Sequence, residues 1–491
     1  MNILFASSEL FPLIKTGGLA DVAYNLPVAL HELGHDVRVI LPGYRQVLEK
    51  MGPKRHLLTH QIGDITVDLL LAELPGVAVP LYVVDCPRLF DREGGPYGHY
   101  SDNGWPDNAE RFGLFCQMIA WLAMNGDQLS WQADVLHGND WQTGLAIALV
   151  SQHAERPATV FTIHNLAYQG LFPEQTLARL GLPPAWWDFR ALEFYGQLSF
   201  IKGGIAFADA VNTVSPNYAK EVITQEHGCG LDGLLRYRGK AFRGIVNGID
   251  TQLWDPASDI DIHLHYSKNT LQNKTRNRDF LLGEFHLPND NRMLIGIVSR
   301  LTEQKGIDLV LQALDKLHRL PVKLIVLGSG EPEYERALQQ FANEHPEFLV
   351  VCLGYNEALA HQMMAGIDAL LIPSRYEPCG LTQLYSQRYG TIPIARKTGG
   401  LADTIIDDAG QGIQNRQATG FLFNDYTCDA LVDVIERALQ AYHEPRQWRS
   451  MQLNAMAQNF SWAASAKQYV EMYQSVSRSE ESIPYAYTGQ P

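Results

Sequence analysis

Cysteine is scarce in this chain of 491 residues, which contains only six. The cysteines stand at positions 86, 116, 229, 352, 379 and 428, and no two of them have the C-x-x-C spacing of a metal or redox site. This pattern argues against a disulfide framework and against a zinc site built on cysteine. We therefore expect reduced thiols and a cytoplasmic protein.

Long apolar runs are also missing. The run Val77–Val84 is interrupted by proline and is far shorter than the roughly 20 residues that a membrane-spanning helix needs. The chain opens directly with the pattern of a buried strand, so we expect no signal peptide. The sequence thus favours a protein without a membrane as partner.

Positive charge is in deficit, with 39 Lys and Arg against 54 Asp and Glu and a formal net charge of −15. Such an acidic chain is poorly suited to nucleic acid or to an anionic membrane as its main partner. A few local cations would have to hold any anionic ligand. Each Lys or Arg beside a glycine-rich turn is therefore a candidate binding residue.

Short β-branched runs alternate with helix-length segments along the whole chain, which predicts an α/β fold with parallel sheets covered on both faces. In the first half we expect strands at Ile3–Ala6, Val37–Leu41, Leu81–Val84, Val135–His137, Thr159–Ile163, Ala210–Val214 and Ile245–Val246. In the second half we expect them at Leu294–Val298, Lys323–Leu327, Phe348–Leu353, Ala369–Ile372, Ile392–Ala395 and Gly420–Phe423. Ligands of such sheets bind at the carboxyl ends of the strands.

Turn signals in Asn247–Asp259 mark the expected boundary between two domains. We expect one domain over residues 1–250 and another over residues 251–460. A polar helical stretch, Thr270–His286, precedes the first strand of the second domain. The last segment, residues 461–491, contains a helix near Trp462–Ser477 that we expect to cross back to the first domain, followed by a loose tail.

The seven residues Lys-Thr-Gly-Gly-Leu-Ala-Asp occur twice, at Lys15–Asp21 and at Lys397–Asp403. Each copy follows a short apolar run and precedes a helix-like stretch, Val22–Leu33 in one case and Thr404–Asp408 in the other. A strand, a glycine-rich turn and a helix in this order direct backbone N–H groups at an anion, and the lysine adds a positive charge. Two unrelated glycine-rich turns are the alternative, but two similar lobes facing one anionic ligand explain the repetition better.

Two loops of the second half carry further charged groups. In Ser299–Gly306, Arg300 and Lys305 are spaced so that both can close on one diphosphate, although a solvated charged loop has the same composition. In Glu377–Thr382, a helix begins near Leu381, Thr382 can cap it, and the free N–H groups face outward. Glu377 then either caps this helix or meets developing positive charge or a polyol.

Polar residues also end two strands of the first half, in His137–Trp141 and Thr162–Asn165. They suit a hydroxyl-rich ligand, although a histidine at a strand end is often structural. Gly328-Ser329-Gly330 resembles a dinucleotide motif, but Glu333 stands where the third glycine belongs. The sequence has no evident Ser-His-Asp order, metal cluster or pair of glycosidase carboxylates.

The motifs Lys15–Asp21, Thr162–Asn165, Asn247–Asp250, Ser299–Gly306, Glu377–Thr382 and Thr398–Leu401 together closely resemble those of bacterial glycogen synthases and the related plant starch synthases. The resemblance runs from Ile3 to about Tyr473. It implies two Rossmann-like domains facing a deep cleft, the GT-B fold. It also implies transfer of glucose from ADP-glucose to the non-reducing end of an α-1,4-glucan, as in glycogen synthesis, with retention of configuration. The implied partners are ADP-glucose and glycogen or an oligoglucan, and neither a metal nor pyridoxal phosphate is expected as cofactor.

The resemblance also implies roles for individual residues. It assigns catalysis to Glu377, Lys15, His164 and Asp140. It assigns substrate binding to Lys15, Gly18, Asp21, Tyr97, Asn247, Arg300, Lys305, Tyr355, Cys379, Gly380, Leu381 and Thr382. Among these, Arg300 and Lys305 would neutralise the diphosphate, and Tyr355 would stack on adenine. The first domain would then lie on the glucan side and the second would bind ADP-glucose.

Some questions stay open at this point. Asn139 and Gln142 stand where related sequences often carry histidine, which affects the acceptor side. The group that meets the cationic sugar is either the backbone carbonyl of His164 or the carboxylate of Glu377. A related retaining transferase that uses UDP-glucose or a small acceptor, and a non-catalytic α-glucan-binding protein of the same fold, are the alternative functions.

Overall fold

A computed structural model describes residues 1–99, 104–354, 356–409 and 417–477 of the chain. The chain divides into two compact units, one formed by Met1–Gly248 together with Trp462–Pro491, the other by Ile249–Ser461. The first unit is therefore discontinuous in sequence. Among the described residues, no helix combines the length and the apolar character needed to cross a membrane.

A nine-stranded sheet forms the centre of the first unit, in the order β12-β11-β7-β6-β1-β2-β5-β4-β3. Its strands are β1 Asn2–Ala6, β2 Asp36–Pro42, β3 Arg55–Ile62, β4 Ile65–Glu73, β5 Pro80–Asp85, β6 Val135–Asn139, β7 Ala158–Ile163, β11 Ala210–Thr213 and β12 Phe242–Gly244. All neighbours pair in parallel except β3 with β4 and β4 with β5, which are antiparallel pairs. Central strands such as β1 are apolar and buried throughout Ile3–Ala6, as both faces of a parallel sheet require.

Ten α-helices accompany this sheet among the described residues: α1 Gly18–Glu32, α2 Arg45–Lys50, α3 Pro87–Phe90, α4 Asn108–Asn125, α5 Trp141–Val150, α6 Gln175–Arg179, α7 Phe200–Phe207, α8 Pro216–Glu221, α9 Asp232–Arg238 and α18 Trp462–Ser477. Short 3₁₀ turns lie at Gly126–Leu129, Pro184–Trp186 and Gly239–Ala241. A small sheet of three short strands, in the order β8-β10-β9, is built from β8 Leu171–Phe172, β9 Glu193–Phe194 and β10 Gln197–Ser199.

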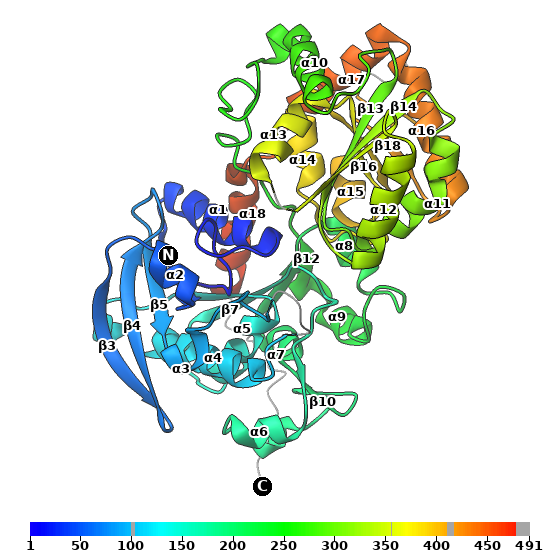
Figure 1. The fold of residues 1–491 in the computed structure, drawn as a ribbon. Helices are drawn as coiled ribbons and strands as arrows, with labels where there is room; N and C mark the ends of the chain where they lie inside the picture. Colours follow the sequence, from blue (N-terminus) through cyan, green and yellow to red (C-terminus); the bar gives the residue numbers. More distant parts are fainter. Residues whose placement is uncertain (100–103, 355, 410–416, 478–491) are drawn as a thin grey trace. The chain divides into compact units, whose positions relative to one another are not determined.

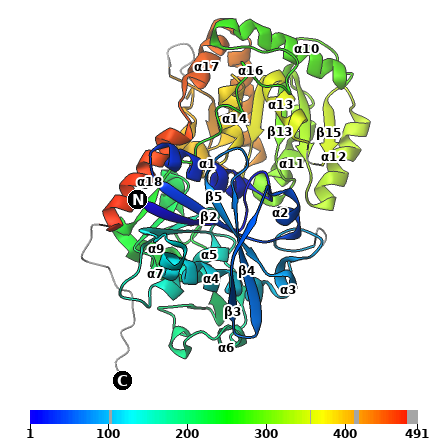
Figure 2. The ribbon, with the colours of Figure 1, turned by 90° about the vertical axis from the view of Figure 1, so that its left-hand side faces the viewer.

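Helix α18 completes the core of the first unit although it is the last helix of the described chain. It packs against α1 and β7, and Figures 1 and 2 both show it beside α1. Tyr469 and Tyr473 are fully buried there. The Tyr473 hydroxyl lies 2.8 Å from His137 Nδ1, and Asn212 Nδ2 donates to the Tyr469 hydroxyl at 3.2 Å.

A six-stranded parallel sheet, in the order β15-β14-β13-β16-β17-β18, forms the centre of the second unit. The strands are β13 Met293–Val298, β14 Val322–Gly328, β15 Leu349–Leu353, β16 Ala369–Ile372, β17 Ile392–Arg396 and β18 Phe421–Phe423. The helices are α10 Lys274–Glu284, α11 Ile307–Leu317, α12 Pro332–Glu344, α13 Glu357–Gly366, α14 Thr382–Arg388, α15 Gly399–Thr404, α16 Cys428–Tyr442 and α17 Pro445–Ala457, with 3₁₀ turns η4 Lys268–Asn273 and η5 Glu303–Lys305.

Alternate residues of β13 serve two separate cores, one on each face of this sheet. Ile295 and Ile297 point into the core shared with α11 and α16, whereas Leu294 points into the core shared with α10, α13 and α14. Figure 1 shows these two sets of helices on opposite faces of the sheet. The near-continuous apolar runs of the sequence reflect this burial on both sides.

Three expected elements differ in the structure. The expected strand at Ile245–Val246 is wrong, because β12 spans Phe242–Gly244 and ends before it. Helix α1 starts at Gly18 instead of Val22, so the glycine-rich turn itself forms the first helical turn. The second copy of the motif behaves likewise: α15 spans Gly399–Thr404, and the expected helix at Thr404–Asp408 is absent from the described chain.

Candidate active site

The first glycine-rich loop connects β1 to α1 and is exposed from Lys15 to Gly18. Gly17 occupies the N-cap position of the 15-residue helix and has no side chain to satisfy the first N–H groups. The Lys15 ammonium lies 2.9 Å from Asp21 Oδ1, on the first turn of the same helix. Free N–H groups at a helix N-terminus attract an anion, and the neighbouring ammonium adds to this attraction.

The buried Glu9 fixes this loop through hydrogen bonds. Its carboxylate accepts hydrogen bonds from Thr16 N at 2.7 Å, from Thr16 Oγ1 at 2.6 Å and from Gly17 N at 3.3 Å. The Tyr97 hydroxyl donates to the same carboxylate at 2.7 Å and lies 2.8 Å from Ser8 Oγ. Burial raises the pKa of Glu9, and the hydrogen bonds from Thr16, Tyr97 and Gly17 oppose that rise. Tyr97, a predicted binding residue, thus contacts the loop through Glu9.

Glu9 was not among the residues predicted from the sequence, because those residues lie within motifs or at strand ends. Glu9 stands three residues after the end of β1, and it is only 3% exposed. A carboxylate is rarely buried so completely without a structural or chemical reason. Its position between β1 and the loop, next to Ser8, was the available signal.

Asp140 and His164 meet at the carboxyl ends of β6 and β7. Asp140 Oδ1 accepts a hydrogen bond from His164 N at 2.7 Å. Burial raises the pKa of Asp140 to about 7, with the backbone N–H groups of His164 and Asn165 opposing the rise. Asp140 also has φ 56° and ψ −179°, a conformation that costs a non-glycine residue of order 1–3 kcal/mol. A strained, buried carboxylate at a strand end is a frequent property of functional sites.

His164 is neutral in this environment, because burial lowers its pKa to about 3. Its Nε2 lies 2.9 Å from Asn139 Oδ1, while Asn139 Nδ2 donates to Ala6 O at 3.0 Å. With the Asn139 amide oriented in this way, Nε2 carries the imidazole proton and Nδ1 is an acceptor. The ring therefore adds no positive charge to this end of the sheet.

Asn247 is 5% exposed, and its Oδ1 atom is buried without a hydrogen-bond partner among the described residues. An orphaned buried acceptor is costly unless a ligand or water completes it. Asn247 is thus suited to receive a hydroxyl hydrogen, the role that the resemblance implies for it.

In the second unit, Lys305 and Glu377 form a close ion pair. Lys305 lies in η5 after β13, Glu377 follows β16, and Lys305 Nζ is 2.6 Å from Glu377 Oε2. The fully buried Ser374 donates its hydroxyl to the same oxygen at 2.9 Å. Glu377 is only 6% exposed. Two donors thus hold one of its carboxylate oxygens at a site with little access to solvent. Ser374 stands in the strand-end segment that precedes Glu377, but the sequence predicted no role of its own for it.

The second copy of the heptapeptide packs against the backbone of the turn that contains Glu377. Gly400 N donates to Glu377 O at 3.1 Å and to Pro378 O at 3.2 Å. A Cβ on Gly399 would lie 1.8 Å from Glu377 O, and one on Gly400 would lie 2.1 Å from Cys379 O. Only glycine fits at such distances. The two copies therefore differ: the first exposes its loop, whereas the second uses its Gly400 N–H on the turn.

The predicted substrate-binding residues Cys379 to Thr382 lead from Glu377 into α14. Gly380 has φ 70°, which favours glycine, and Leu381 occupies the N-cap position without a side-chain cap. The expectation that Thr382 caps this helix is therefore wrong, since Thr382 is its first helical residue. Arg300 contacts Gln304 in the loop after β13, through Nη2 and Oε1 at 3.3 Å. Tyr355 lies outside the described residues.

The predicted residues thus form separate groups. Lys15, Gly18 and Asp21 share one loop and helix turn, and Asp140 bonds directly to His164. Lys305 bonds to Glu377 in the other unit.

One cluster of metal-ligand type occurs among the described residues, at Asp259, Asp261 and His361. His361 Nδ1 lies 2.8 Å from Asp259 Oδ2, which the Tyr389 hydroxyl also contacts. Asp259 Oδ1 accepts from Asp261 N at 2.9 Å. Both oxygens of Asp259 are thus used by protein donors, and none of the predicted site residues belongs to this cluster.

Comparison with known protein families gives two matches. Residues 2–237 match the starch synthase catalytic domain, and residues 283–452 match the glycosyl transferases group 1 family. The two matches fall within the first and the second unit, respectively.

Curated proteins and solved structures match over nearly the full length. Glycogen synthase 1 of Methylococcus capsulatus is 51% identical over 96% of both chains, and the glycogen synthase of Thioalkalivibrio sulfidiphilus is 50% identical over 96% of this chain and 99% of its own. The catalytic domain of starch synthase IV from Arabidopsis thaliana, bound to ADP and acarbose, is 31% identical with a TM-score of 0.88, over 97% of this chain and 99% of that one. Sucrose-phosphate synthase from Thermosynechococcus elongatus, 18% identical with a TM-score of 0.59 over 96% of this chain and 98% of its own, shares the fold.

Proposed function

The chain belongs to the family of bacterial glycogen synthases and plant starch synthases, and from this membership we propose that it transfers glucose from ADP-glucose to the non-reducing end of an α-1,4-glucan. It is a glycosyltransferase of the GT-B fold. The anomeric configuration is retained in the proposed reaction, and the product is a lengthened glycogen chain.

The group of the half-buried Lys305 with the buried Glu377 and Ser374 is the observation that supports this proposal most directly. Departure of ADP builds negative charge on the diphosphate and positive charge on the sugar. Lys305 and Arg300, in one loop, would stabilise the diphosphate, and the preorganised Glu377 carboxylate would act on the sugar. Lys305 forms an ion pair with Glu377 in this structure, and donor binding would draw its ammonium towards phosphate and leave Ser374 to hold the carboxylate.

The first unit would contribute a second set of groups. Lys15 and the N-terminus of α1 would contact the phosphates, with Gly18 and Asp21 on the same turn. Asp140, His164 and Asn247 would surround the transferred glucose. The neutral His164 ring leaves two candidates for the group that meets the cationic sugar, its backbone carbonyl and the Glu377 carboxylate.

In the second unit, Cys379 to Thr382 would bind the nucleotide sugar through backbone N–H groups, and Tyr355 would stack on adenine. The protein cations would do the work that a metal does in other transferases, so we propose that no metal and no pyridoxal phosphate is required. The six cysteines, all within the described residues, form no disulfide, which supports a reducing cytoplasm as its location.

Transfer of radiolabelled glucose to glycogen tests the proposal, with ADP-glucose and UDP-glucose compared at equal concentration. We expect incorporation from ADP-glucose to exceed that from UDP-glucose, and Glu377→Ala to lose it. Preference for UDP-glucose, or transfer to small acceptors only, would contradict the proposal. Binding of glycogen without any transfer would identify a non-catalytic glucan-binding protein instead.

A further inference from the structure

The second unit contains a pocket of about 310 Å³ that none of the predicted site residues lines. Two chain segments meet there, residues 249–251 and 456–461, which are the first and the last of this unit. Ile249 N donates to Phe460 O at 2.8 Å, and Ile249 and Ser461 form a parallel bridge. The volume is at the lower end of the range for small-molecule sites, so it fits a small metabolite better than a nucleotide.

Arg388 presents one edge of its guanidinium to this pocket while the other edge is fixed. Its Nη2 donates to Asp255 Oδ2 at 2.7 Å and its Nε to Trp254 O at 3.4 Å. Among the described residues, its Nη1 has no hydrogen-bond partner. The side chain is therefore held in place with two N–H donors available, and a guanidinium prepared in this way suits a phosphate group.

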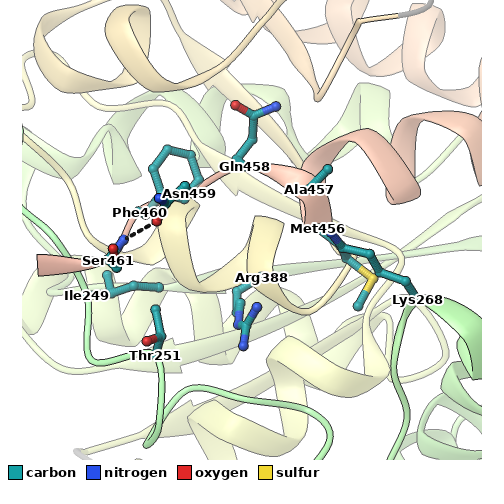
Figure 3. Close-up of a pocket in the computed structure, with 10 residues that line it drawn as sticks. All are labelled: Ile249, Thr251, Lys268, Arg388, Met456, Ala457, Gln458, Asn459, Phe460 and Ser461. Carbon is teal, nitrogen blue, oxygen red and sulfur yellow. Dashed lines mark hydrogen bonds between the residues drawn. The ribbon is translucent and has the colours of Figure 1, made fainter. Parts of the chain in front are cut away.

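Lys268 supplies a second cation, from the first position of η4. In the part of the chain that the structure describes, its ammonium forms no hydrogen bond or ion pair. Figure 3 shows Arg388 among the lining side chains and Lys268 extending towards Met456. Because the chain as a whole is strongly acidic, with a net charge of −15, two cations at one small pocket favour an anion there.

The remaining lining groups suit the uncharged part of such a ligand. Asn459 Oδ1 accepts from Ser461 N at 3.1 Å, which leaves its amide hydrogens as donors. Thr251 and Ser461 add hydroxyl groups, and Met456 and Phe460 add apolar surface. Small-molecule sites combine apolar surface with a few polar groups that orient the ligand, and hydroxyl and amide groups can hydrogen-bond to a polyol.

We propose that this pocket binds a phosphate monoester of a small polyol, such as a sugar phosphate, as an effector. The phosphate would lie between Arg388 and Lys268, and the hydroxyl groups would contact Asn459 and Ser461. A ligand held in this way would tie residues 249–251 to residues 456–461, which adjoin both points where the chain passes between its two units. The pocket would therefore influence turnover without contacting the donor.

Calorimetric titration of the full-length protein with glycerol 3-phosphate and with glucose 6-phosphate tests the binding. Saturating ADP is present throughout, because it occupies the phosphate-binding groups of the proposed active site. We expect saturable 1:1 binding that Lys268→Ala weakens at least ~10-fold, the scale of one charge-assisted hydrogen bond. Arg388→Lys keeps a charge beside Asp255 but removes the fork, and it should weaken binding as well.

Two control variants separate the pocket from other effects. Lys467→Ala removes an exposed lysine of the first unit and should leave binding unchanged. Arg300→Ala should also leave it unchanged, whatever it does to transfer, so the result does not depend on the proposed activity. Equal binding to the wild type and to Lys268→Ala, loss of binding in Arg300→Ala, or sulfate binding as tightly as the esters would overturn the site.

The effector role has a readout of its own. The esters should change the kcat of the wild type at saturating donor by at least ~2-fold and leave the kcat of Lys268→Ala unchanged, while both proteins have the same kcat without ester. Tight binding in the pocket without any change in kcat would overturn this role.

Discussion

Replacing Ser374 with alanine removes a single hydroxyl, the one that donates to Glu377 Oε2 at 2.9 Å. In the proposed mechanism Lys305 turns towards the diphosphate, so this hydroxyl alone would keep the carboxylate in place as the transition state forms. A hydrogen bond to a charged group contributes about 1.5–3 kcal/mol. At about 1.4 kcal/mol for each factor of ten in rate, we expect kcat to fall about 10- to 100-fold. The KM for ADP-glucose should change little, because Ser374 is fully buried behind Glu377.

Steady-state kinetics with glycogen and varied ADP-glucose measures this split between kcat and KM. Ser386→Ala is a matched control, because Ser386 is equally buried in the same unit and donates to Gln383 O at 3.0 Å. Both variants should lose about 1 kcal/mol of unfolding free energy, and the control should keep a normal kcat. A normal kcat in Ser374→Ala, or an equal loss in both variants, would refute the idea that Ser374 positions Glu377.

Four further predictions follow from the same geometry. Glu377→Ala should fold but lose at least ~10²-fold in kcat, and near-normal turnover would reduce Glu377 to a structural role. Arg300→Ala and Lys305→Ala should each raise the KM for ADP-glucose and lower kcat, since the charge on the diphosphate grows along the reaction. Wild-type activity should survive EDTA. Inhibition by EDTA that Mg²⁺ reverses would contradict the proposal that these two side chains neutralise the diphosphate. The raised pKa of Asp140 means that the folded state binds its proton more tightly than the unfolded state does. The free energy of unfolding of the wild type should therefore fall as the pH rises from about 4 to about 7. Denaturant titrations of Asp140→Asn should lack that part of the decline. Because the proposed donor contacts are divided between the two units, X-ray scattering should give a smaller radius of gyration with ADP and an oligoglucan, and unchanged scattering at saturation would count against closure.

The sequence was most informative where local pattern and burial agree. The β-branched runs predicted twelve strands at or near their observed places, because strands buried on both faces must be apolar throughout. The hairpin of β3 and β4 was missed, since no residue of β3 is buried and its sequence, Arg55–Ile62, reads as a polar segment. An edge strand such as β3 needs little apolar surface, and the strand with which it pairs is determined by the tertiary structure.

For the candidate site, the sequence identified residues in motifs but not those that hold them. Ser374 and Glu9 act through other side chains, and a lone serine or glutamate carries no spacing signal. The repeated heptapeptide was the strongest pattern, yet identical letters serve different purposes in its two copies. In the second copy, Gly399 and Gly400 face backbone carbonyls of the Glu377 turn, and only coordinates reveal such contacts.

The place of α18 in the first unit has a consequence for biosynthesis. A ribosome has made residues 1–248 long before it reaches Tyr469 and Tyr473, the side chains that bond to Asn212 and His137. Throughout the synthesis of residues 249–461, the nascent first unit lacks the helix that covers α1 and β7, whereas the second unit is contiguous and has all its strands as soon as it emerges. A premature stop codon between the codons for residues 461 and 469 would therefore damage the amino-terminal unit first.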